Sequence, residues 1–533
     1  MKEFLRKIDY KKVVFVLFYI FAFTLLLRNS FNYLDPDLGW HLKVGEEISI
    51  SGSVPDLNHY NYVSRESWVD HEWLSNLLVY QIYNHGGYLA LSIVFALFVV
   101  FALFLINKEA LRRFPGLPLG FILGLETFGL VACLPHFGLR IQELGLVFVT
   151  ALLLFISYYN RQPRRRLLLF LPLGFYLWAS LHASFLLGLG LLAAWIGIKI
   201  GERILARCRN LAWLDLSALW PWSRILDWLA IALLSLLATC LTPYRLKLYS
   251  FLSDYGDSFY RSHLQEWLSQ FSFPFTYWQL AYLALVTLSL FLYIHQAFSA
   301  RRRHPLKLWD LFLVIFFVCL SWQSRRHFPL MFVVTFLFII ETHLRLWTVS
   351  TVTVKSRINV WLRAYLLACL LLVSLLQLTQ TRFSADPFRS NCADYPCGAT
   401  AFLQSHSEYN DKRLFNHYAW GGYLIWVWPE RQLFIDGRLP QLPFAGHTYL
   451  AEYYEFFKAG TDFAAKLQQY DISLVLLPAQ DHDLQAAAWE RWLFMISDED
   501  LLARNRLREF LQSSPSWQKV YEDATAVVYE RRD

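Results

Sequence analysis

Long apolar runs separated by short polar stretches fill the first 380 residues. Each run approaches the roughly 20 residues that an α-helix needs to cross a bilayer. The first run is followed by Arg28 and not by the small residues of a signal-peptide cleavage site, so an uncleaved helix is favoured over a signal peptide. The pattern predicts about 11 transmembrane helices. The runs cover 13–27, 88–106, 118–135, 140–158, 167–183, 184–200, 225–242, 277–296, 308–323, 328–346 and 361–379.

Basic stretches between the runs predict the orientation, because cytoplasmic loops carry an excess of Lys and Arg. The N-terminus is basic, and with this number of helices the other basic stretches fall on its side. We therefore expect a bacterial cytoplasmic (inner) membrane protein with a cytoplasmic N-terminus. Arg325 and Arg326 lie on the outer side and break the rule, which indicates an anionic partner. The basic stretches are 2–12, 108–113, 161–166, 203–209 and 301–307.

The chain changes character after residue 380. Residues 1–380 are predicted to form the transmembrane domain, with the first outer loop at 29–87, and residues 381–533 an extracytoplasmic α/β domain. Cys392 and Cys397 could form a disulfide in that oxidising compartment or remain thiols. The predicted fold is a multi-pass α-helical membrane protein with a C-terminal soluble α/β domain. Strands are predicted at 413–418, 432–438, 472–478 and 524–531, and helices at 461–471 and 483–512.

Composition supports a membrane protein and argues against nucleic acid as a partner. The 533 residues are 56% hydrophobic and only 17% charged, against about 25% charged in soluble domains. The formal net charge is +7, but the basic residues cluster between apolar runs. Their distribution is therefore a topology signal and not a nucleic-acid footprint.

The first outer loop holds the candidate chemistry. "LDPDLGWH" places Asp35 and Asp37 around a proline and His41 shortly after, and "VDHEW" adds His71 and Glu72. A partly desolvated carboxylate can act as general base on a hydroxyl or amine. Asp, Glu and His can also hold a divalent metal ion such as Mg²⁺ or Mn²⁺. The alternative is that these acids cap helices and face water.

Cationic and aromatic residues in other outer segments are further candidates. Arginines at helix ends suit a phosphate or diphosphate, which they can grip with two hydrogen bonds. Their alternative role is to reach lipid phosphates at the bilayer surface. The candidates for binding donor phosphate are Arg140, His182, Arg245, Arg325 and Arg326.

Two short motifs stand out in the C-terminal domain, "WGGY" with Trp420 and "DGR" with Asp436 and Arg438. In one interpretation they form the roof of the membrane site or recognise the acceptor. In the other, the glycines shape turns and Asp436 forms an internal ion pair with Arg438.

Together these features resemble the GT-C class of integral-membrane glycosyltransferases. The class includes protein O-mannosyltransferases, aminoarabinose transferases and oligosaccharyltransferase catalytic subunits. Its first outer loop opens with an acidic motif, which "LDPDLGWH" resembles, and closes with a second element similar in layout to "VDHEWLSNLL". The chain is also similar to a set of bacterial membrane proteins that share a D-x-x-W-H-L start and a late W-G-G-Y-L…D-G-R block.

The resemblance implies an inverting hexosyl or pentosyl transferase that uses a sugar on a polyprenyl phosphate. The acceptor, whether glycan, lipid or protein, is left open. Asp37 is preferred over Asp35 as the base, because it lies nearer His41. By the same resemblance, Glu72 with His71 or His41 would engage a metal or the acceptor. The acceptor roof would be Trp420, Asp436 and Arg438, and the donor phosphate would meet Arg325, Arg326 and Arg140.

Two other functions are compatible with this layout. A lipid-linked glycan transporter or flippase would carry charges within its membrane helices, along a path through the bilayer. In this chain charge is concentrated at the helix ends, which favours an active site on the outer face. A non-catalytic component of envelope polysaccharide assembly would account for the C-terminal domain but not for the acidic loop.

Overall fold

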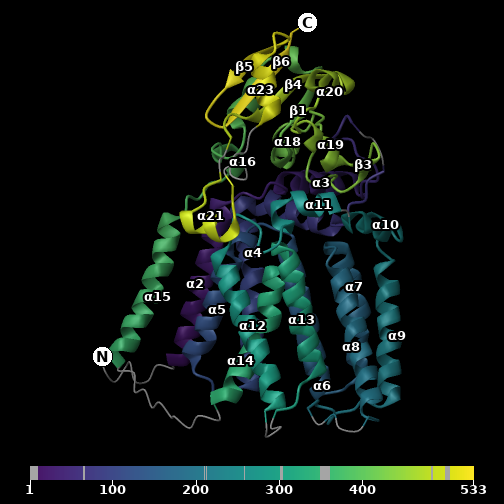
Figure 1. Cartoon of the computed structure of the whole chain (residues 1–533), viewed down its shortest axis with the longest axis vertical. Coiled ribbons are helices and arrows are strands. Elements are labelled where there is room, and N and C mark those ends of the chain that lie inside the picture. Colours follow the sequence, from purple (N-terminus) through teal and green to yellow (C-terminus); the bar gives the residue numbers. More distant parts are fainter. Residues whose placement is uncertain are drawn as a thin grey trace. The chain divides into compact units, whose positions relative to one another are not determined.

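The computed structural model describes residues 10–63, 67–208, 211, 213–256, 258–299, 304–347, 360–481, 484–497 and 505–532 (Figure 1). Much of the basic stretches at 2–12 and 301–307 lies outside the described residues. The chain forms two compact units. The helical unit comprises Met1–Tyr33, Ser92–Thr242 and Glu266–Phe383, and the mixed unit comprises Leu34–Leu91, Pro243–Gln265 and Ser384–Asp533.

Every predicted apolar run contains a helix, and most of these helices lie in the helical unit. Among the described residues, 8 helices are long and apolar enough to cross a membrane, and two shorter apolar helices accompany them. The multi-pass helical fold predicted from the sequence is therefore confirmed. The helices are α2 (Tyr10–Asn32), α4 (Trp73–Arg113), α5 (Leu119–Cys133), α6 (Gln142–Arg161), α7 (Phe170–Leu181), α8 (Phe185–Leu205), α9 (Trp222–Thr239), α12 (Tyr277–Phe298), α13 (Leu308–Gln323), α14 (Phe328–Trp347) and α15 (Val360–Gln380).

The mixed unit contains the first outer loop and the C-terminal region. Sequence reasoning did not foresee a helix directly after the acidic motif, but Leu38–Ser51 forms α3. Helix α4 begins in this unit and is broken at Gly87, whose φ is 67°. The other helices are α10 (Lys247–Ser253), α11 (Ser258–His263), α16 (Pro387–Ser390), α17 (Cys397–Ser405), α18 (Gly421–Val427), α19 (Tyr449–Glu455), α20 (Phe463–Gln469), α21 (Ala488–Phe494) and α23 (Arg506–Ser513).

A four-stranded sheet with the order β1-β4-β6-β5 forms the centre of the C-terminal region. β1 (Arg413–Asn416) is parallel to β4 (Ile472–Pro478), and β6 (Ala526–Arg531) is antiparallel to both β4 and β5 (Trp517–Glu522). A separate two-stranded ribbon pairs β2 (Pro443–Phe444) with β3 (His447–Thr448). The predicted α/β character is therefore confirmed, with β5 as a strand that the sequence patterns did not reveal.

Two local predictions in this region are wrong. Residues 432–438 form no strand beyond an isolated bridge between Leu433 and Asn61. The Oδ1 atom of Asn416 accepts hydrogen bonds from the backbone N–H groups of Phe434 and Ile435 at 3.0 and 3.4 Å, so a side chain replaces a neighbouring strand. The single helix predicted over 483–512 is interrupted, because α21 ends at Phe494 and the next residue, Met495, is in a left-handed conformation with φ of 53°.

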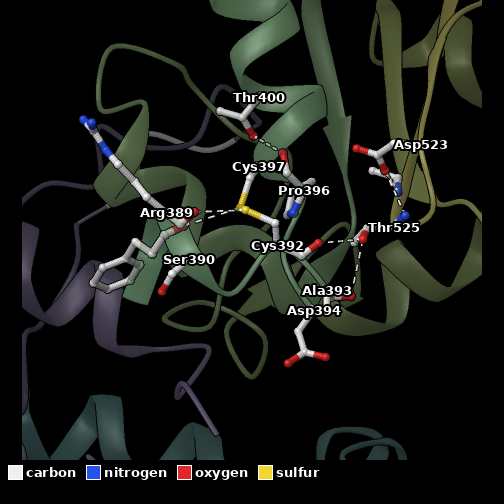
Figure 2. The surroundings of a disulfide bond; sticks show 12 residues. Arg389, Ser390, Cys392, Ala393, Asp394, Pro396, Cys397, Thr400, Asp523 and Thr525 are labelled. Carbon is white, nitrogen blue, oxygen red and sulfur yellow. Dashed lines mark hydrogen bonds between the residues drawn. A yellow bond between two sulfur atoms is a disulfide. The ribbon is translucent and has the colours of Figure 1, made fainter. Parts of the chain in front are cut away.

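Cys392 and Cys397 form a disulfide at the edge of the sheet, which resolves the open question about this pair (Figure 2). The hydroxyl of Thr525 donates to the carbonyl of Cys392 at 2.7 Å. The carboxylate of Asp523 accepts from the backbone N–H groups of Thr525 and Ala526, both at 2.8 Å. These bonds connect the disulfide loop to the turn that precedes β6.

Two glycines allow α3 and α18 to pack in direct backbone contact. A Cβ atom added at Gly39 would lie 2.1 Å from the carbonyl oxygen of Gly422, and one added at Gly422 would lie 2.2 Å from the carbonyl oxygen of Pro36. No side chain fits at either position unless the backbone moves. The W-G-G-Y motif therefore has a packing role, since it brings α18 against the start of α3.

We predict that Gly39→Ala destabilises the mixed unit by about 1–3 kcal/mol, the usual cost of overpacking. Gly124→Ala is the matched control, because Gly124 is also helical but its Cβ would meet nothing within 4 Å. The measurement is the thermal unfolding midpoint in detergent. An equal midpoint in the two variants would contradict the proposed contact.

Candidate active site

Asp37 lies where α3 begins and faces the DGR turn. Its Oδ1 atom accepts a hydrogen bond from the indole N–H of Trp40 at 3.0 Å, and its carbonyl accepts from the backbone N–H of His41 at 3.2 Å. A Cβ atom at Gly437 would lie 2.0 Å from this Oδ1, so the glycine leaves the carboxylate its space. The side chain is half-buried. The helix N-terminus favours the ionised carboxylate that a general base requires.

Asp35 has a different local role. Its Oδ1 accepts a hydrogen bond from the backbone N–H of Asp37 at 2.9 Å and so shapes the turn before α3. Both carboxylates lie near Tyr395, whose hydroxyl donates to the carbonyl of Leu34 at 2.9 Å. Burial, and then the charges of Asp35 and Asp37, raise the pKa of Tyr395. The phenol therefore remains a hydrogen-bond donor at neutral pH.

A buried polar chain connects His41, Asn76 and Asp70. The Nδ1 atom of His41 lies 2.6 Å from Oδ1 of Asn76. The amide nitrogen of Asn76 donates to both oxygens of Asp70, at 2.9 and 2.8 Å. Because the amide donates toward the carboxylate, its oxygen faces the ring and Nδ1 carries the proton. The Nε2 atom of His41 is therefore the acceptor of a neutral imidazole.

Burial shifts the two titratable ends of this chain in opposite directions. It lowers the pKa of His41 from 6.5 to about 3, although the hydrogen bond to Asn76 works against this shift. It raises the pKa of Asp70 from 3.8 to about 7, again against its hydrogen bonds. At neutral pH the imidazole is uncharged, and the Asp70 carboxyl keeps its proton to a higher pH than an exposed carboxyl does.

His71 and Glu72 are neighbours with limited exposure. The Nε2 atom of His71 lies 3.6 Å from Oε1 of Glu72. The imidazole ring packs against Phe251 and Tyr255, with centroids 5.4 and 5.7 Å away. The backbone N–H of Glu72 donates to Asp70 at 3.2 Å. This pair therefore connects the end of the first outer loop to the segment that carries α10.

Asp436 and Arg438 form a fully buried ion pair, with 2.8 Å between Oδ2 and the guanidinium and no exposed side-chain surface. The guanidinium also donates to Asn58 and Asn61, both at 3.1 Å. It lies over the ring of Tyr60 at 4.4 Å. These contacts join the DGR turn to the first outer loop and fix the position of Gly437. This is the internal ion pair that the sequence left as an alternative, and an acceptor-binding role for either residue stays a prediction.

Trp420 is 5% exposed, and its indole N–H donates to the carbonyl of Asp394 at 2.9 Å. It lies edge-on to His417, and burial lowers the pKa of His417 to about 4.

Arg245 is exposed in a left-handed turn with φ of 51°. The neighbouring Tyr244 donates its hydroxyl hydrogen bond to the carbonyl of Pro55.

Arg140 and Arg326 of the helical unit share one carboxylate. Glu266 pairs with Arg140 at 3.3 Å and also with Arg326. Burial tends to raise the pKa of Glu266, but the two arginines outweigh it and lower that pKa overall. Arg326 also lies over the ring of Trp267 at 5.1 Å. The exception to the charge rule indicated an anionic partner, and Glu266 is one that sequence reasoning missed.

Arg325 and His182 are held locally. Arg325 is 5% exposed. Its Nε donates to the carbonyl of Ser269 at 3.1 Å and its terminal nitrogen to that of Ser272. The Nδ1 atom of His182 lies 2.7 Å from the hydroxyl of Ser184, at the start of α8. The arginine therefore stabilises the loop before α12, and the histidine stabilises the turn between α7 and α8.

The predicted metal ligands do not converge. Among the described residues, no three His, Cys, Asp or Glu side chains group closely enough to hold a metal ion. Asn76 separates His41 from Asp70, and the carboxylate of Asp37 faces Gly437. The residues present thus do not form a ready site for Mg²⁺ or Mn²⁺, and the chemistry proposed below uses the chain's own groups.

The chain is an integral membrane protein with a GT-C fold that is similar to the fold of oligosaccharyltransferases. The chain is similar to the crystal structure of the Archaeoglobus fulgidus oligosaccharyltransferase in the apo form. The sequences are 11% identical, 89% of this chain and 70% of that chain are covered, and the TM-score is 0.51. It is also similar to the archaeal oligosaccharyltransferase AglB from Archaeoglobus fulgidus in complex with an inhibitory peptide and a dolichol-phosphate. For that structure the sequences are 11% identical, 88% of this chain and 70% of that chain are covered, and the TM-score is 0.51.

At this identity the likeness establishes the fold. No protein-family model and no curated protein matches the sequence. The GT-C architecture expected from the sequence is confirmed, whereas the likeness does not single out a particular bacterial family within the class.

Burial shifts the pKa values of His41 and Asp70 in opposite directions. We therefore predict that their effects on the pH dependence of stability partly cancel. Between about pH 4 and 7 the folded protein keeps a proton on Asp70 that the unfolded chain has lost, so Asp70 makes stability fall as the pH rises. Between about pH 3 and 6.5 the unfolded chain protonates His41 but the folded protein does not, so His41 makes stability rise with pH. The two contributions oppose each other where the windows overlap.

His41→Gln should leave only the Asp70 contribution, and its stability should fall relative to wild type by up to about 1.4 kcal/mol per pH unit between pH 4 and 6.5. Asp70→Asn should show the reverse slope. Thermal unfolding of the three proteins in detergent across this pH range measures the effect. Parallel pH profiles for both variants and wild type would contradict it.

Proposed function

We propose that this chain is a membrane glycosyltransferase that moves a sugar from a polyprenyl-phosphate-linked donor to an acceptor on the outer face of the bacterial inner membrane. The observation that carries the proposal is the position of Asp37, a half-buried carboxylate held between Trp40 and the DGR turn. The fold supports it, since a solved protein with this fold binds a dolichol-phosphate. The sugar, hexosyl or pentosyl, and the acceptor, whether glycan, lipid or protein, are left open.

The reaction requires one base and a stabilised leaving group. An acceptor oxygen or nitrogen attacks the anomeric carbon and forms the new bond. The bond from that carbon to the lipid phosphate oxygen breaks, and the configuration inverts. Asp37 takes the acceptor's proton. Asp70 and Asp436 are completely buried and serve internal contacts, so they suit this role less well than Asp37.

Arg326 and Arg140 are our candidates for binding the donor phosphate. Their side chains are partly exposed, at 28% and 29%, and Glu266 pairs with both. An anionic phosphate can take a place beside these two cations, because a guanidinium group can bind phosphate through two parallel hydrogen bonds. Arg325 contributes differently, by holding the loop at Ser269 and Ser272.

His41, His71 and Glu72 are proposed to position the acceptor. The neutral imidazole of His41 offers an acceptor lone pair at Nε2, which suits a hydroxyl or amine donor. Trp420, Asp436 and Arg438 would support the roof of the acceptor site through the DGR turn. Arg245 and His182 remain candidates for electrostatic support of the donor.

Asp37→Asn should abolish transfer while the protein still folds, because loss of a general base typically costs about 10²–10⁴-fold in rate. Asp35→Asn is the matched control, because asparagine keeps an oxygen for the hydrogen bond from residue 37. The assay measures transfer of labelled sugar from polyprenyl phosphate by purified protein, with thermal unfolding measured in parallel. Full activity of the Asp37 variant would remove this residue from the mechanism.

Arg326→Ala and Arg325→Ala should have different effects. Loss of Arg326 should raise the KM for the donor about tenfold or more, since a charged hydrogen bond to phosphate contributes about 1.5–3 kcal/mol. Loss of Arg325 should lower the unfolding midpoint, because two backbone carbonyls lose their donor. Donor titrations and thermal unfolding of both variants separate these effects. An unchanged donor KM in Arg326→Ala would refute the phosphate assignment.

A further inference from the structure

A cavity of about 520 Å³ opens inside the helical unit, at the end opposite Arg140 and Arg326. Helix α6 shows the separation, because Arg140 precedes its first residue and Arg161 is its last residue. With 20 residues, this helix spans about 30 Å, which matches the hydrocarbon thickness of a bilayer. The cavity thus lies at the end of the unit that the basic loops assign to the cytoplasm.

The wall of this cavity combines an apolar interior with a charged rim. Aliphatic side chains of α6, α13 and α14 line the interior, among them Leu153, Leu313 and Leu337. Arg113 and Arg161 line the rim at the ends of α4 and α6. This distribution fits a ligand with one apolar and one charged part.

Three arginines gather around one carboxylate on one side of the rim. Glu109 accepts hydrogen bonds from Arg112 at 2.7 and 2.8 Å, from Arg113 at 2.7 Å and from Arg161 at 3.0 Å. Three guanidinium groups thus share this one carboxylate, and the three arginine side chains remain 43%, 30% and 34% exposed. Ser157 donates to Glu109 and accepts from both Arg113 and Arg161, which fixes the two groups side by side.

The rest of the rim carries both signs of charge as well as aromatic rings. Lys307 pairs with Glu341 at 2.9 Å and lies 3.9 Å from Asp310, and all three line the cavity. Lys199 pairs with Glu202 at 2.7 Å and lies over the ring of Trp195 at 4.4 Å. Trp195 contacts Trp309 edge-on, with centroids 5.0 Å apart. Tryptophans gather at the boundary between bilayer and water. The aromatic side of the rim therefore places the mouth of the cavity at that boundary.

We propose that this cavity binds a phosphate ester that carries a long apolar chain, with the phosphate at Arg113 and Arg161 and the chain between α6 and α14. An excess of basic residues on the cytoplasmic side explains cations at this end. It explains neither three arginines ordered on one buried carboxylate nor an apolar cavity directly beneath them. The ligand chemistry can come from a diacyl phospholipid or from a polyprenyl phosphate.

Native mass spectrometry of the full chain in detergent tests the proposal, with dioleoyl phosphatidylglycerol and undecaprenyl phosphate titrated separately. The double variant R113Q/R161Q should bind at least one of these lipids tenfold or more weakly than wild type. R164Q/R166Q is the matched control, because it removes two positive charges from the same end without touching the cavity lining. The lipid whose affinity falls only in R113Q/R161Q identifies the source of the ligand.

Leu337→Trp provides a second test that keeps every charge and fills the apolar part of the cavity. This variant should weaken binding of the same lipid while the net charge of the protein stays the same. It remains informative if R113Q/R161Q fails to fold. Equal losses in R113Q/R161Q and R164Q/R166Q would show general surface attraction and overturn the proposal. Unchanged binding of both lipids in R113Q/R161Q or in Leu337→Trp would also overturn it.

Discussion

The backbone contact between α3 and α18 is the constraint on which the candidate site depends. Because Gly39 and Gly422 lack side chains, the start of α3 lies directly against the W-G-G-Y helix, and the turn that follows residue 435 reaches Asp37. The buried pair of Asp436 and Arg438 then fixes Gly437 beside the carboxylate. Segments some 400 residues apart in the chain are thus brought to one carboxylate by close packing and one buried ion pair.

A buried ion pair is an expensive way to hold a turn, since desolvation offsets most of its Coulomb attraction. Here the guanidinium also donates hydrogen bonds to Asn58 and Asn61 and lies over the rings of Tyr60 and Trp68. These contacts specify one geometry of the turn, which an apolar replacement could not do. Precise placement of the base can outweigh this loss of stability, because small displacements of catalytic groups reduce rates strongly.

The membrane helices could be predicted from the sequence because lipid-length apolar runs depend only on local composition. The strand predicted at 432–438 failed for a reason that lies elsewhere in the chain, namely the side chain of Asn416, which takes the backbone hydrogen bonds of Phe434 and Ile435. Helix α3 was missed because its residues mix Trp, His, Lys and Glu without clear periodicity. Its buried face is defined only by the partner helix.

The candidate site was predictable in part for similar reasons. The acidic motif after the first helix drew attention to Asp35 and Asp37, but it could not reveal that Asp35 shapes the turn before Asp37. Asn76 and Gly437 carry no signal of their own, since an amide or a glycine becomes informative only beside its neighbour. Glu266 was missed, because the two arginines on the outer side indicated an anionic partner but the sequence pointed to a donor phosphate and not to this acid.

At each end of the helical unit, one carboxylate orders several arginine side chains. At one end Glu266 orients two arginines, and at the other Glu109 orients three. An arriving anion meets side chains whose conformational entropy is already lost, so more of the interaction energy appears as affinity. By this argument the prior ordering of the guanidinium groups, more than their number, determines how tightly an anionic headgroup binds.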